Sequence, residues 1–336
     1  MTSMLSLLEN LKSSRVLVIG YIMLDHYLWG DVHRISPEAP VPVVHATHDT
    51  YSAGGAANVA LNLANLGVKT SILGYCAQDE AGLRLVEILS GNAIEIVCID
   101  DTAKAPTIIK TRVIIRNQQL CRIDREVSRE SYRLDENPGF NDMLDRALDG
   151  VDAIIISDYA KGVITQELVD HLMNISRQRP GLLIAVDPKP SRNISFQRAG
   201  LITPNRNEAL EMAGLPQPQY DEKYPLEEVC RRIYAQYNPK LLVITLGAEG
   251  MAICQEGKVV KHLPTEAQEV FDVSGAGDTV ISTLTAALAS GIDPSSAAWL
   301  ANGAAGCVVA HMGTVPIKLD ELQKWLIEHE DKINVS

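Results

Sequence analysis

Short runs of consecutive apolar residues alternate with longer amphipathic stretches along most of the chain. The clearest runs cover residues 15–20, 153–157, 182–186 and 241–245. An apolar run of five or six residues is typical of a parallel strand that is buried on both faces. Helical stretches lie between the last three runs, so strands and helices alternate. This order predicts a parallel sheet with helices on both faces and a ligand site at the carboxyl ends of the strands.

Polar residues and a glycine follow the carboxyl ends of these strands, as such a ligand site requires. They are Asp25, Asp158, Lys161, Asp187, Lys189, Thr245 and Gly247, with Asn205 and Glu208 after a further short strand at 201–202. Asp25 lies shortly after Gly20, where a carboxylate accepts hydrogen bonds either from substrate hydroxyls or from the turn that it caps. The sequence leaves both interpretations open.

Two further segments have the patterns of exposed β structure. Three prolines between residues 34 and 44 exclude a helix and a central strand, which predicts an ordered loop that feeds an edge strand. Polar and apolar positions alternate over residues 107–125, which predicts a two-stranded ribbon with its turn near Asn117 and Gln118. The ribbon carries five cations, Lys110, Arg112, Arg116, Arg122 and Arg125. In an acidic chain they favour a lid over a phosphate, with a solvated charged face as the alternative.

A glycine-rich stretch in the C-terminal third joins a loop to a helix. Residues 269–280 read EVFDVSGAGDTV, and apolar residues at helical spacing follow them. Gly275 and Gly277 lack a Cβ, so their N–H groups can approach a ligand at the positive end of the helix dipole, where anions bind. The carboxylate of Asp278 would oppose such an anion unless it acts as a base. A base beside amides that stabilise a transferring phosphoryl group suits phosphoryl transfer to a hydroxyl; a helix capped by Ser274 or Asp278 is the alternative.

A second glycine pair begins an earlier helix. Residues 53–58 are AGGAAN, and apolar residues at helical spacing follow until Gly67. Small residues at the start of a helix let a ligand approach its backbone. Asn58 offers a donor and an acceptor, which suits a sugar hydroxyl, although an asparagine in a first helical turn is often only structural.

The bulk composition narrows the class of protein. A chain of 336 residues with 46% apolar content can bury a large core, and one large domain is expected. The net charge of −12 argues against a nucleic-acid surface and means that an anionic substrate needs a local cluster of Lys and Arg. No stretch has the pattern of a signal peptide or a membrane span, so a soluble cytoplasmic protein that binds no membrane is expected.

The cysteines are scattered and include no C-x-x-C pair. They are Cys76, Cys98, Cys121, Cys230, Cys254 and Cys307. This spacing suggests neither a zinc site nor a disulfide framework. The six residues are therefore expected to be buried thiols.

The motifs together resemble those of a known family. Gly54-Gly55-x-x-Asn58 and Asp272-x-Ser-Gly-Ala-Gly-Asp278 are similar to the two signatures of the ribokinase-like (PfkB) sugar kinases, in the right order. Asn205-x-x-Glu208 and Thr245-x-Gly247 are similar to the intermediate motifs of that family. Several stretches also resemble the kinase part of the heptose enzymes of lipopolysaccharide synthesis, namely residues 23–25, 34–42, 116–120, 157–162, 187–189 and 264–270.

This resemblance implies an α/β fold, a ribokinase-like three-layer sandwich with a central, mostly parallel sheet and a small β lid from about residues 31–47 and 107–125. It implies that the protein uses ATP and Mg²⁺ to phosphorylate the anomeric O1 of D-glycero-β-D-manno-heptose 7-phosphate. The chain contains no H-x-G-H nucleotidyltransferase signature, so a kinase-only form or a fragment of the fused enzyme is expected. Relatives often pair their lids between two protomers, which favours a homodimer.

The resemblance also assigns roles to individual residues. Asp278 is the expected base, and the amides of Gly275, Ala276 and Gly277 are expected to stabilise the transferring phosphoryl group. The expected nucleotide site consists of Asn205, Glu208 (which holds Mg²⁺ through water), Thr245, Gly247 and Asn302. The expected sugar site consists of Asp25, Gly54, Gly55, Asn58 and Asp158, with Arg116 and Lys189 on the 7-phosphate. A K⁺ site is expected at Asp272, Ser274, Val308, His311 and Gly313.

Two alternatives remain beside the heptose kinase. Tyr21 stands where the heptose enzymes usually carry an acidic residue, so another sugar kinase of the family, of the fructose or ribose type, is one alternative. A non-catalytic nucleotide-binding protein on the same fold is the other, and the intact Asp278 argues against it.

Overall fold

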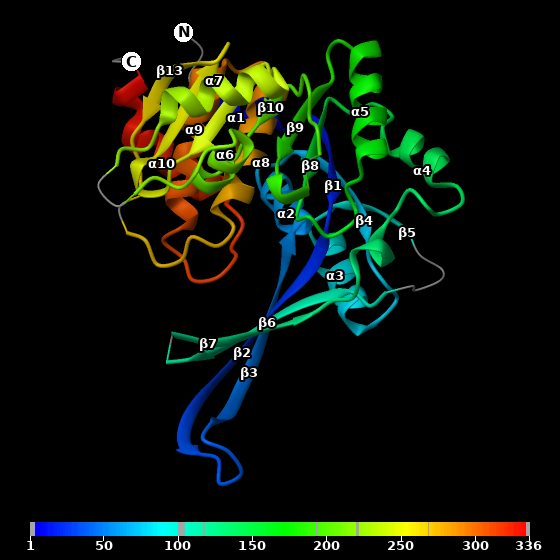
Figure 1. The fold of residues 1–336 in the computed structure, drawn as a ribbon, viewed down its shortest axis with the longest axis vertical. Coiled ribbons are helices and arrows are strands. Elements are labelled where there is room, and N and C mark those ends of the chain that lie inside the picture. The colour runs from blue at the N-terminus through cyan, green and yellow to red at the C-terminus, as the bar shows by residue number, and fades with distance from the viewer. Residues whose placement is uncertain are drawn as a thin grey trace.

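The computed structural model describes residues 4–99, 105–116, 118–192, 194–219, 222–267 and 269–333. Asn117, at the predicted turn of the ribbon, lies outside these residues. The described chain forms a helix-covered body and a β lid that projects from it (Figure 1).

The body is built on a nine-stranded sheet with the order β13-β12-β11-β10-β9-β8-β1-β4-β5. The strands are β1 (Arg15–Gly20), β4 (Lys69–Tyr75), β5 (Glu95–Ile99), β8 (Ala153–Ser157), β9 (Leu183–Asp187), β10 (Leu201–Ile202), β11 (Leu241–Thr245), β12 (Met251–Gln255) and β13 (Lys258–Leu263). Neighbours from β5 to β11 pair in parallel, whereas β12 and β13 are antiparallel. The predicted, mostly parallel sheet is confirmed.

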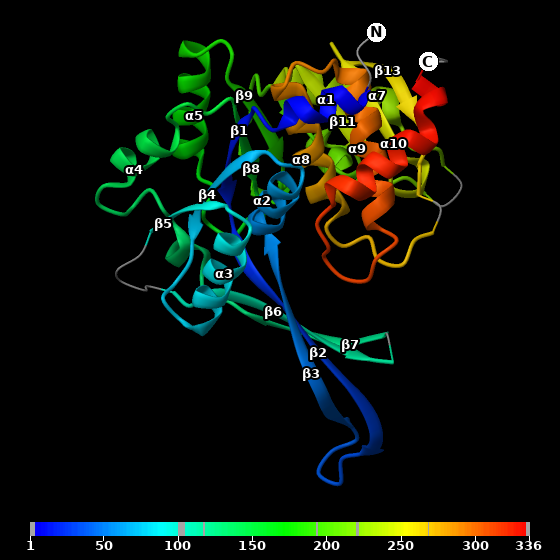
Figure 2. The same cartoon turned by 180° about the vertical axis from the view of Figure 1, so that it is seen from behind.

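Helices cover both faces of this sheet. One face carries α1 (Met4–Leu11), α2 (Ala56–Asn65), α3 (Glu80–Gly91), α8 (Ala276–Ala289), α9 (Pro294–Val308) and α10 (Leu319–Ile333). The other carries α4 (Phe140–Ala147), α5 (Gln166–Gln178), α6 (Arg206–Met212) and α7 (Leu226–Tyr237), and the two groups are seen from opposite sides in Figures 1 and 2. Within β1, Val16 and Val18 join the first core while Leu17 and Ile19 join the second, because successive strand residues point to opposite faces. The three-layer α/β sandwich is thus confirmed.

The lid is a separate four-stranded sheet with the order β3-β2-β6-β7. Its strands are β2 (Ile22–Ile35), β3 (Pro42–Gly55), β6 (Ile108–Ile115) and β7 (Gln118–Arg125). β2 pairs antiparallel to β3 and parallel to β6, and the β2–β3 hairpin extends far from the body (Figure 1). The predicted ribbon and the proline-rich loop before an edge strand are confirmed. The first lid segment is longer than the predicted 31–47, because both strands run back to the body and include the expected sugar residues.

The structure corrects the expectation for the cysteines. Cys230 of α7 and Cys254 of β12 form a disulfide, with Cα atoms 6.3 Å apart. Unpaired thiols were the wrong prediction for this pair, because α7 packs over β12 and brings together two residues that no sequence motif connects. Cys121 is exposed, Cys76 is buried and Cys307 is partly buried, so the prediction of burial fails for Cys121. None of the described helices is long and apolar enough to cross a membrane.

Candidate active site

A pocket of about 190 Å³ lies at the carboxyl ends of the central strands, where α8 begins. Its lining comes from the segments after β8, β9, β10 and β11 and from the glycine-rich loop. The lining residues are Asp158, Tyr159, Asp187, Pro188, Lys189, Thr203, Asn205, Glu208, Thr245, Gly275, Gly277 and Asp278. Eight of the residues that the sequence assigned to catalysis, nucleotide or sugar therefore line one pocket.

Asp278 lies in the first turn of α8, whose N-cap Gly275 has a left-handed backbone with φ of 82°. Both carboxylate oxygens of Asp278 accept hydrogen bonds: Asn58 Nδ2 donates at 2.8 Å and the Tyr159 hydroxyl donates at 3.1 Å. A Cβ on Gly275 would lie 2.9 Å from Asn58 Nδ2, so glycine is required by both conformation and space. Two donors and a helix N-terminus thus hold one carboxylate in a single orientation.

The environment of Asp278 also sets its proton affinity. Burial raises the pKa of Asp278 to about 6, the hydrogen bonds from Asn58 and Tyr159 act in the opposite direction, and the negative charge of Asp25 raises it further. A base with a pKa near 6 is mostly ionised at neutral pH and is more basic than an ordinary aspartate.

This pKa predicts a pH profile. Only the ionised carboxylate can accept a proton, so kcat/KM should fall about tenfold per pH unit below pH 6 and reach a plateau above it. Because a sugar phosphate itself titrates near pH 6, the profile should also be measured with an unphosphorylated sugar. A rate that stays flat from pH 5 to pH 8 with that sugar, when chemistry limits the rate, would contradict a role for Asp278 as the base.

A buried polar network holds the helix of Asn58 against the helix of Asp278. The Asn62 amide donates to Asn58 O at 2.8 Å, while its oxygen accepts from Thr279 Oγ1 at 2.9 Å and from Ile317 N at 3.0 Å. Asn62 is completely buried. No sequence motif includes Asn62, and the one sequence signal for it is its position one helical turn after Asn58.

Three of the expected sugar residues, Asp25, Gly54 and Gly55, lie on lid strands β2 and β3 near the body. Asp25 is buried and forms an ion pair with Arg112 of β6. A Cβ on Gly54 would lie 2.3 Å from Asp25 Oδ2, and Gly55 has φ of 60° with Tyr21 O close by, so only glycine fits at both positions. The interpretation of Asp25 as a turn cap is wrong, because it lies inside β2.

The structure distinguishes between the cations of the ribbon. Lys110 pairs in register with Asp25, and its ammonium lies 5.7 Å from the centre of the Tyr159 ring. Arg116, by contrast, follows β6, has a side chain that is 76% exposed, and lies 3.9 Å from Asp31. Lys189 lines the pocket and Arg116 does not. The structure therefore does not bring Arg116 and Lys189 together.

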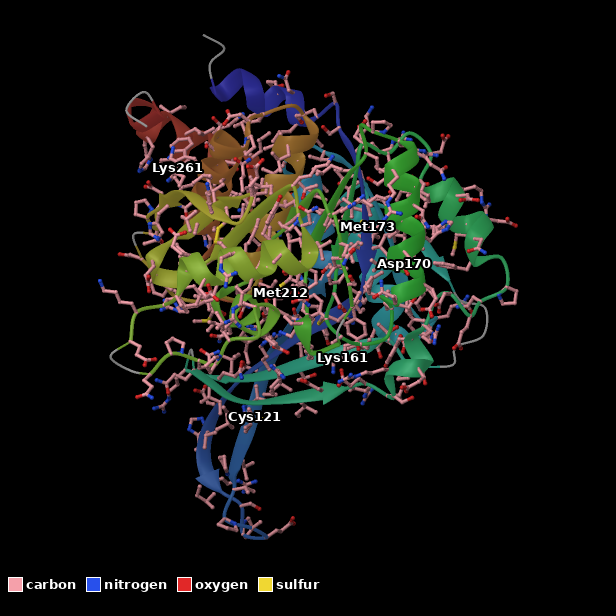
Figure 3. All side chains as sticks on the ribbon, turned by 45° about the horizontal axis from the view of Figure 1, so that its top comes forward. Cys121, Lys161, Asp170, Met173, Met212 and Lys261 are labelled. Atoms are coloured by element: carbon pink, nitrogen blue, oxygen red, sulfur yellow. A yellow bond between two sulfur atoms is a disulfide. The ribbon has the colours of Figure 1, made fainter. Side chains whose placement is uncertain are left out.

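Tyr21, the departure from the heptose pattern, is buried below the lid. Its ring packs edge-on against Tyr132 with centroids 5.6 Å apart, and its hydroxyl lies 3.5 Å from Glu126 Oε2. Glu126 also forms an ion pair with Lys161, which is labelled in Figure 3 where the lid meets the body.

Of the expected nucleotide residues, Asn205, Glu208 and Thr245 line the pocket, whereas Gly247 and Asn302 do not. Asn205 caps α6 by accepting hydrogen bonds from Asn207 N and Glu208 N, both at 3.0 Å, and Glu208 returns one to Asn205 N. Lys189 Nζ donates to Glu208 at 3.0 Å, and Thr245 bridges to Asn205. The Asn205-x-x-Glu208 motif is thus a capping box that also points its carboxylate into the pocket.

Carboxylates are concentrated in this pocket. Burial raises the pKa of Asp187 well above its usual range, and the charges of Glu208 and Asp278 raise it further. Such a group of negative charges favours a cation. Among the described residues, no three acidic, histidine or cysteine side chains lie close enough to bind a metal directly. The donor set therefore fits a hydrated Mg²⁺, which keeps several waters.

The residues predicted to bind K⁺ lie on two adjacent segments. Asp272 accepts hydrogen bonds from Ser274 N at 2.9 Å and from Gly313 N at 3.0 Å, while Val308 O accepts from His311 N at 3.1 Å. Asn302 of α9, predicted near the adenine, donates to Pro264 O at 2.6 Å. These contacts stabilise the two loops that flank the glycine-rich segment.

The fold and the pocket together define a kinase of the ribokinase type. The model of the pfkB family carbohydrate kinases matches residues 13–321, and the chain belongs to this family. It is therefore a phosphotransferase with an alcohol group as acceptor.

Curated relatives agree with this family assignment. The chain is 41% identical over 330 residues to the bifunctional protein HldE of Magnetococcus marinus, covering 95% of this chain and 66% of the relative. It is 41% identical over 320 residues to HldE of Geobacter sulfurreducens, covering 94% and 64%. The chain thus spans just under two thirds of the length of these relatives.

The solved structures support the fold. Phosphofructokinase-2 of Escherichia coli in complex with potassium is 18% identical with a TM-score of 0.75, covering 94% of this chain and 99% of that one. Ribokinase of Arabidopsis thaliana complexed with ribose and ATP is 18% identical with a TM-score of 0.71, covering 93% and 98%. The ribokinase-like fold is confirmed.

Proposed function

We propose that the protein is an ATP-dependent kinase of D-glycero-β-D-manno-heptose 7-phosphate that phosphorylates the anomeric O1. The product, the 1,7-bisphosphate, serves the synthesis of ADP-heptose and of the lipopolysaccharide core. One observation carries the kinase chemistry: Asp278 lies at the N-terminus of α8 and accepts a hydrogen bond from Asn58 of the neighbouring helix α2. The sugar assignment is supported by the HldE relatives and by the heptose-type motifs.

The residues supply a direct in-line transfer. Asp278 accepts the proton of O1 as the oxygen attacks the γ-phosphorus, and the bond from that phosphorus to the β–γ bridging oxygen breaks to release ADP. The amides of Gly275, Ala276 and Gly277 stabilise the negative charge on the transferring group. Asn58 and Tyr159 keep the carboxylate oriented toward O1.

The nucleotide is assigned to the part of the pocket lined by Asn205 and Thr245, with Gly247 after the same strand as Thr245 and Asn302 near the adenine. Glu208 and Asp187 would hold a hydrated Mg²⁺, which would neutralise charge on the phosphates when bound. Lys189 forms an ion pair with Glu208 and lines the same pocket, which supports a role for its ammonium group in binding a phosphate.

The sugar is assigned to the inner end of the lid. Asp25, Gly54, Gly55, Asn58 and Asp158 hold its hydroxyls, and lid cations with Lys189 hold its phosphate. The outer lid strand β7 exposes Leu120 and Ile123, with 47% and 59% of each residue accessible. These apolar residues support the predicted homodimer, which light scattering in solution tests.

A phosphoryl-transfer screen tests the proposed function. Heptose 7-phosphate, heptose, fructose, fructose 6-phosphate and ribose are compared at equal ATP and Mg²⁺. The proposal requires the highest kcat/KM with heptose 7-phosphate. A preference for a fructose or ribose substrate would establish the other sugar kinase, and an absence of ATP turnover with every sugar would favour the non-catalytic alternative.

We also propose the K⁺ site at Asp272, Ser274, Val308, His311 and Gly313. The hydrogen bonds that Asp272 accepts from Ser274 N and Gly313 N, next to the glycine-rich loop, support this proposal. A bound cation would order that loop, so kcat should rise several-fold when K⁺ is added to enzyme in a buffer of a large organic cation. Na⁺ at equal ionic strength is the control for screening. Equal rates with and without K⁺ would remove this site from the proposal.

A further inference from the structure

Tyr27 of lid strand β2 makes an unusual contact with the far C-terminal part of the chain. The residue is buried, and its hydroxyl oxygen accepts a hydrogen bond from Thr314 N at 3.1 Å. Thr314 Oγ1 lies 3.4 Å from the same hydroxyl and 3.5 Å from Asp25 Oδ2. A Cβ on Gly313 would lie 3.2 Å from the hydroxyl, so glycine at that position allows the phenol to approach. The side chain therefore joins the lid to residues 313–314.

Residues 313–314 are in turn joined to the glycine-rich loop by two contacts. Gly313 N donates to one oxygen of Asp272, whose other oxygen accepts from Ser274 N. A Cβ on Gly275 would lie 3.0 Å from the Thr314 methyl group, so that methyl packs directly against the loop. The path from the lid to the phosphoryl-stabilising amides thus consists of contiguous contacts.

We propose that Tyr27 is a positioning residue that couples the sugar-binding lid to the glycine-rich loop through Thr314, Gly313 and Asp272. Sugar that engages Asp25 contacts the strand that carries Tyr27, so ordering this strand also orders the loop that binds the transferring phosphoryl group. The contacts that link Tyr27 to the loop exist in the substrate-free protein, so the coupling can be tested without substrate. Its kinetic consequence rests on the proposed function.

The first experiment uses hydrogen–deuterium exchange of the substrate-free protein, in a buffer without K⁺ so that no bound ion contributes to the order of the loop. Tyr27→Phe keeps the ring and removes the acceptor. We expect peptides covering 309–315 and 270–276 to exchange roughly five- to tenfold faster than in the wild type, the change for losing one ordinary hydrogen bond. Tyr51→Phe is the matched control. Tyr51 lies in the same lid, stacked on His26 and below Arg84, and its variant should leave both peptides unchanged.

Each outcome of this experiment decides the proposal. Faster exchange in 309–315 alone would overturn it, because Tyr27 would then hold only its neighbour. Unchanged exchange in both peptides would overturn it as well. If Tyr27→Phe does not fold, Thr314→Ala is the second variant, because it removes both the hydroxyl that faces Tyr27 and Asp25 and the methyl group that packs on the loop. Faster exchange in 270–276 together with the lid peptide 22–30 supports the coupling, and a change confined to 309–315 rejects it.

Kinetics provide the second measurement. The loop acts on the transition state, so Tyr27→Phe should lower kcat about five- to tenfold while the KM for ATP and for sugar changes less than twofold. A rise in the sugar KM with unchanged kcat would show that Tyr27 serves binding alone and would overturn the coupling. An error in the sugar assignment would leave the exchange result intact, so the two failures are distinguishable.

Discussion

Replacing Asp278 with asparagine is expected to lower kcat by a factor of about 10²–10⁴, the range for losing a positioned base. The substitution keeps the size of the side chain and its neighbours, because Asn58 can still donate to the amide oxygen and the Tyr159 hydroxyl can accept from the amide nitrogen. Binding of ATP and sugar should therefore change little. The measurement is single-turnover phosphoryl transfer, which separates chemistry from product release. A variant that retained the wild-type rate of chemistry would show that Asp278 is not the base.

The same substitution should stabilise the folded protein at alkaline pH. The pKa of Asp278 is raised to about 6 in the folded state, so the folded state holds this proton at a pH where the unfolded chain has released it. Stability therefore falls as pH rises from about 4 through about 6, and the full penalty is present at pH 8. The rise of the Asp278 pKa from its ordinary value to about 6 corresponds to at most about 3 kcal/mol of stability. Asparagine does not titrate, so Asp278→Asn should unfold at higher urea at pH 8, and its advantage should disappear near pH 4.

The second large effect is expected at Arg112. Arg112→Met keeps much of the apolar stem but leaves Asp25 as a buried carboxylate without its cation. Breaking a buried pair from one side costs about 3–5 kcal/mol of stability, and a displaced Asp25 should lower kcat/KM for the sugar at least about 100-fold. Arg116→Met is the matched control in the same ribbon. Its exposed guanidinium pairs only loosely with Asp31, so its effect on stability should stay below about 1 kcal/mol.

The double variant Asp25→Asn/Arg112→Met separates lost charge pairing from lost packing. Neither charge remains, so urea unfolding should show that a large part of the stability lost in Arg112→Met is recovered, although sugar turnover stays low because the carboxylate is absent. If the double variant is no more stable than Arg112→Met, the stability loss comes from packing of the Arg112 stem and the role of the ion pair is refuted.

Comparing kcat/KM for a phosphorylated and an unphosphorylated sugar identifies the cations that bind the phosphate. The ratio of kcat/KM for heptose 7-phosphate over heptose is measured in the wild type, Lys189→Ala and Arg116→Ala. If a residue binds the 7-phosphate, its alanine variant should lose ~1.5–3 kcal/mol of transition-state stabilisation, measured by kcat/KM, with the phosphorylated sugar and almost none with heptose. This is the magnitude of a hydrogen bond to a charged group. The prediction for Arg116 requires the lid to close. If the ratio stays constant for Arg116→Ala, its lid-base neighbours Lys110 and Arg112 become the candidates.

Structural features that depend only on residues close together in the sequence were predictable from the sequence. Apolar runs predicted the buried strands, alternation predicted the β6–β7 ribbon, and the glycines before Asp278 predicted a loop that opens a helix. Each rests on a local property, namely side-chain periodicity or the conformational freedom of glycine. The sequence motifs then indicated the protein family, and the family resemblance identified the candidate site residues along the chain.

Other features were decided only by the tertiary structure. Asn58 and Asp278 are 220 residues apart, and no local pattern indicates that one donates a hydrogen bond to the other. The sequence motifs single out neither Tyr159 nor Asn62. The segment after β8 brings the Tyr159 hydroxyl to Asp278, and the packing of α2 against α8 brings Asn62 to Thr279. Among five similar cations in one ribbon, only the register of β6 against β2 separates Arg112, which pairs with buried Asp25, from exposed Arg116. The physical reason is that hydrogen bonds, ion pairs and burial depend on distances through space, and these are set when the lid and the body pack together.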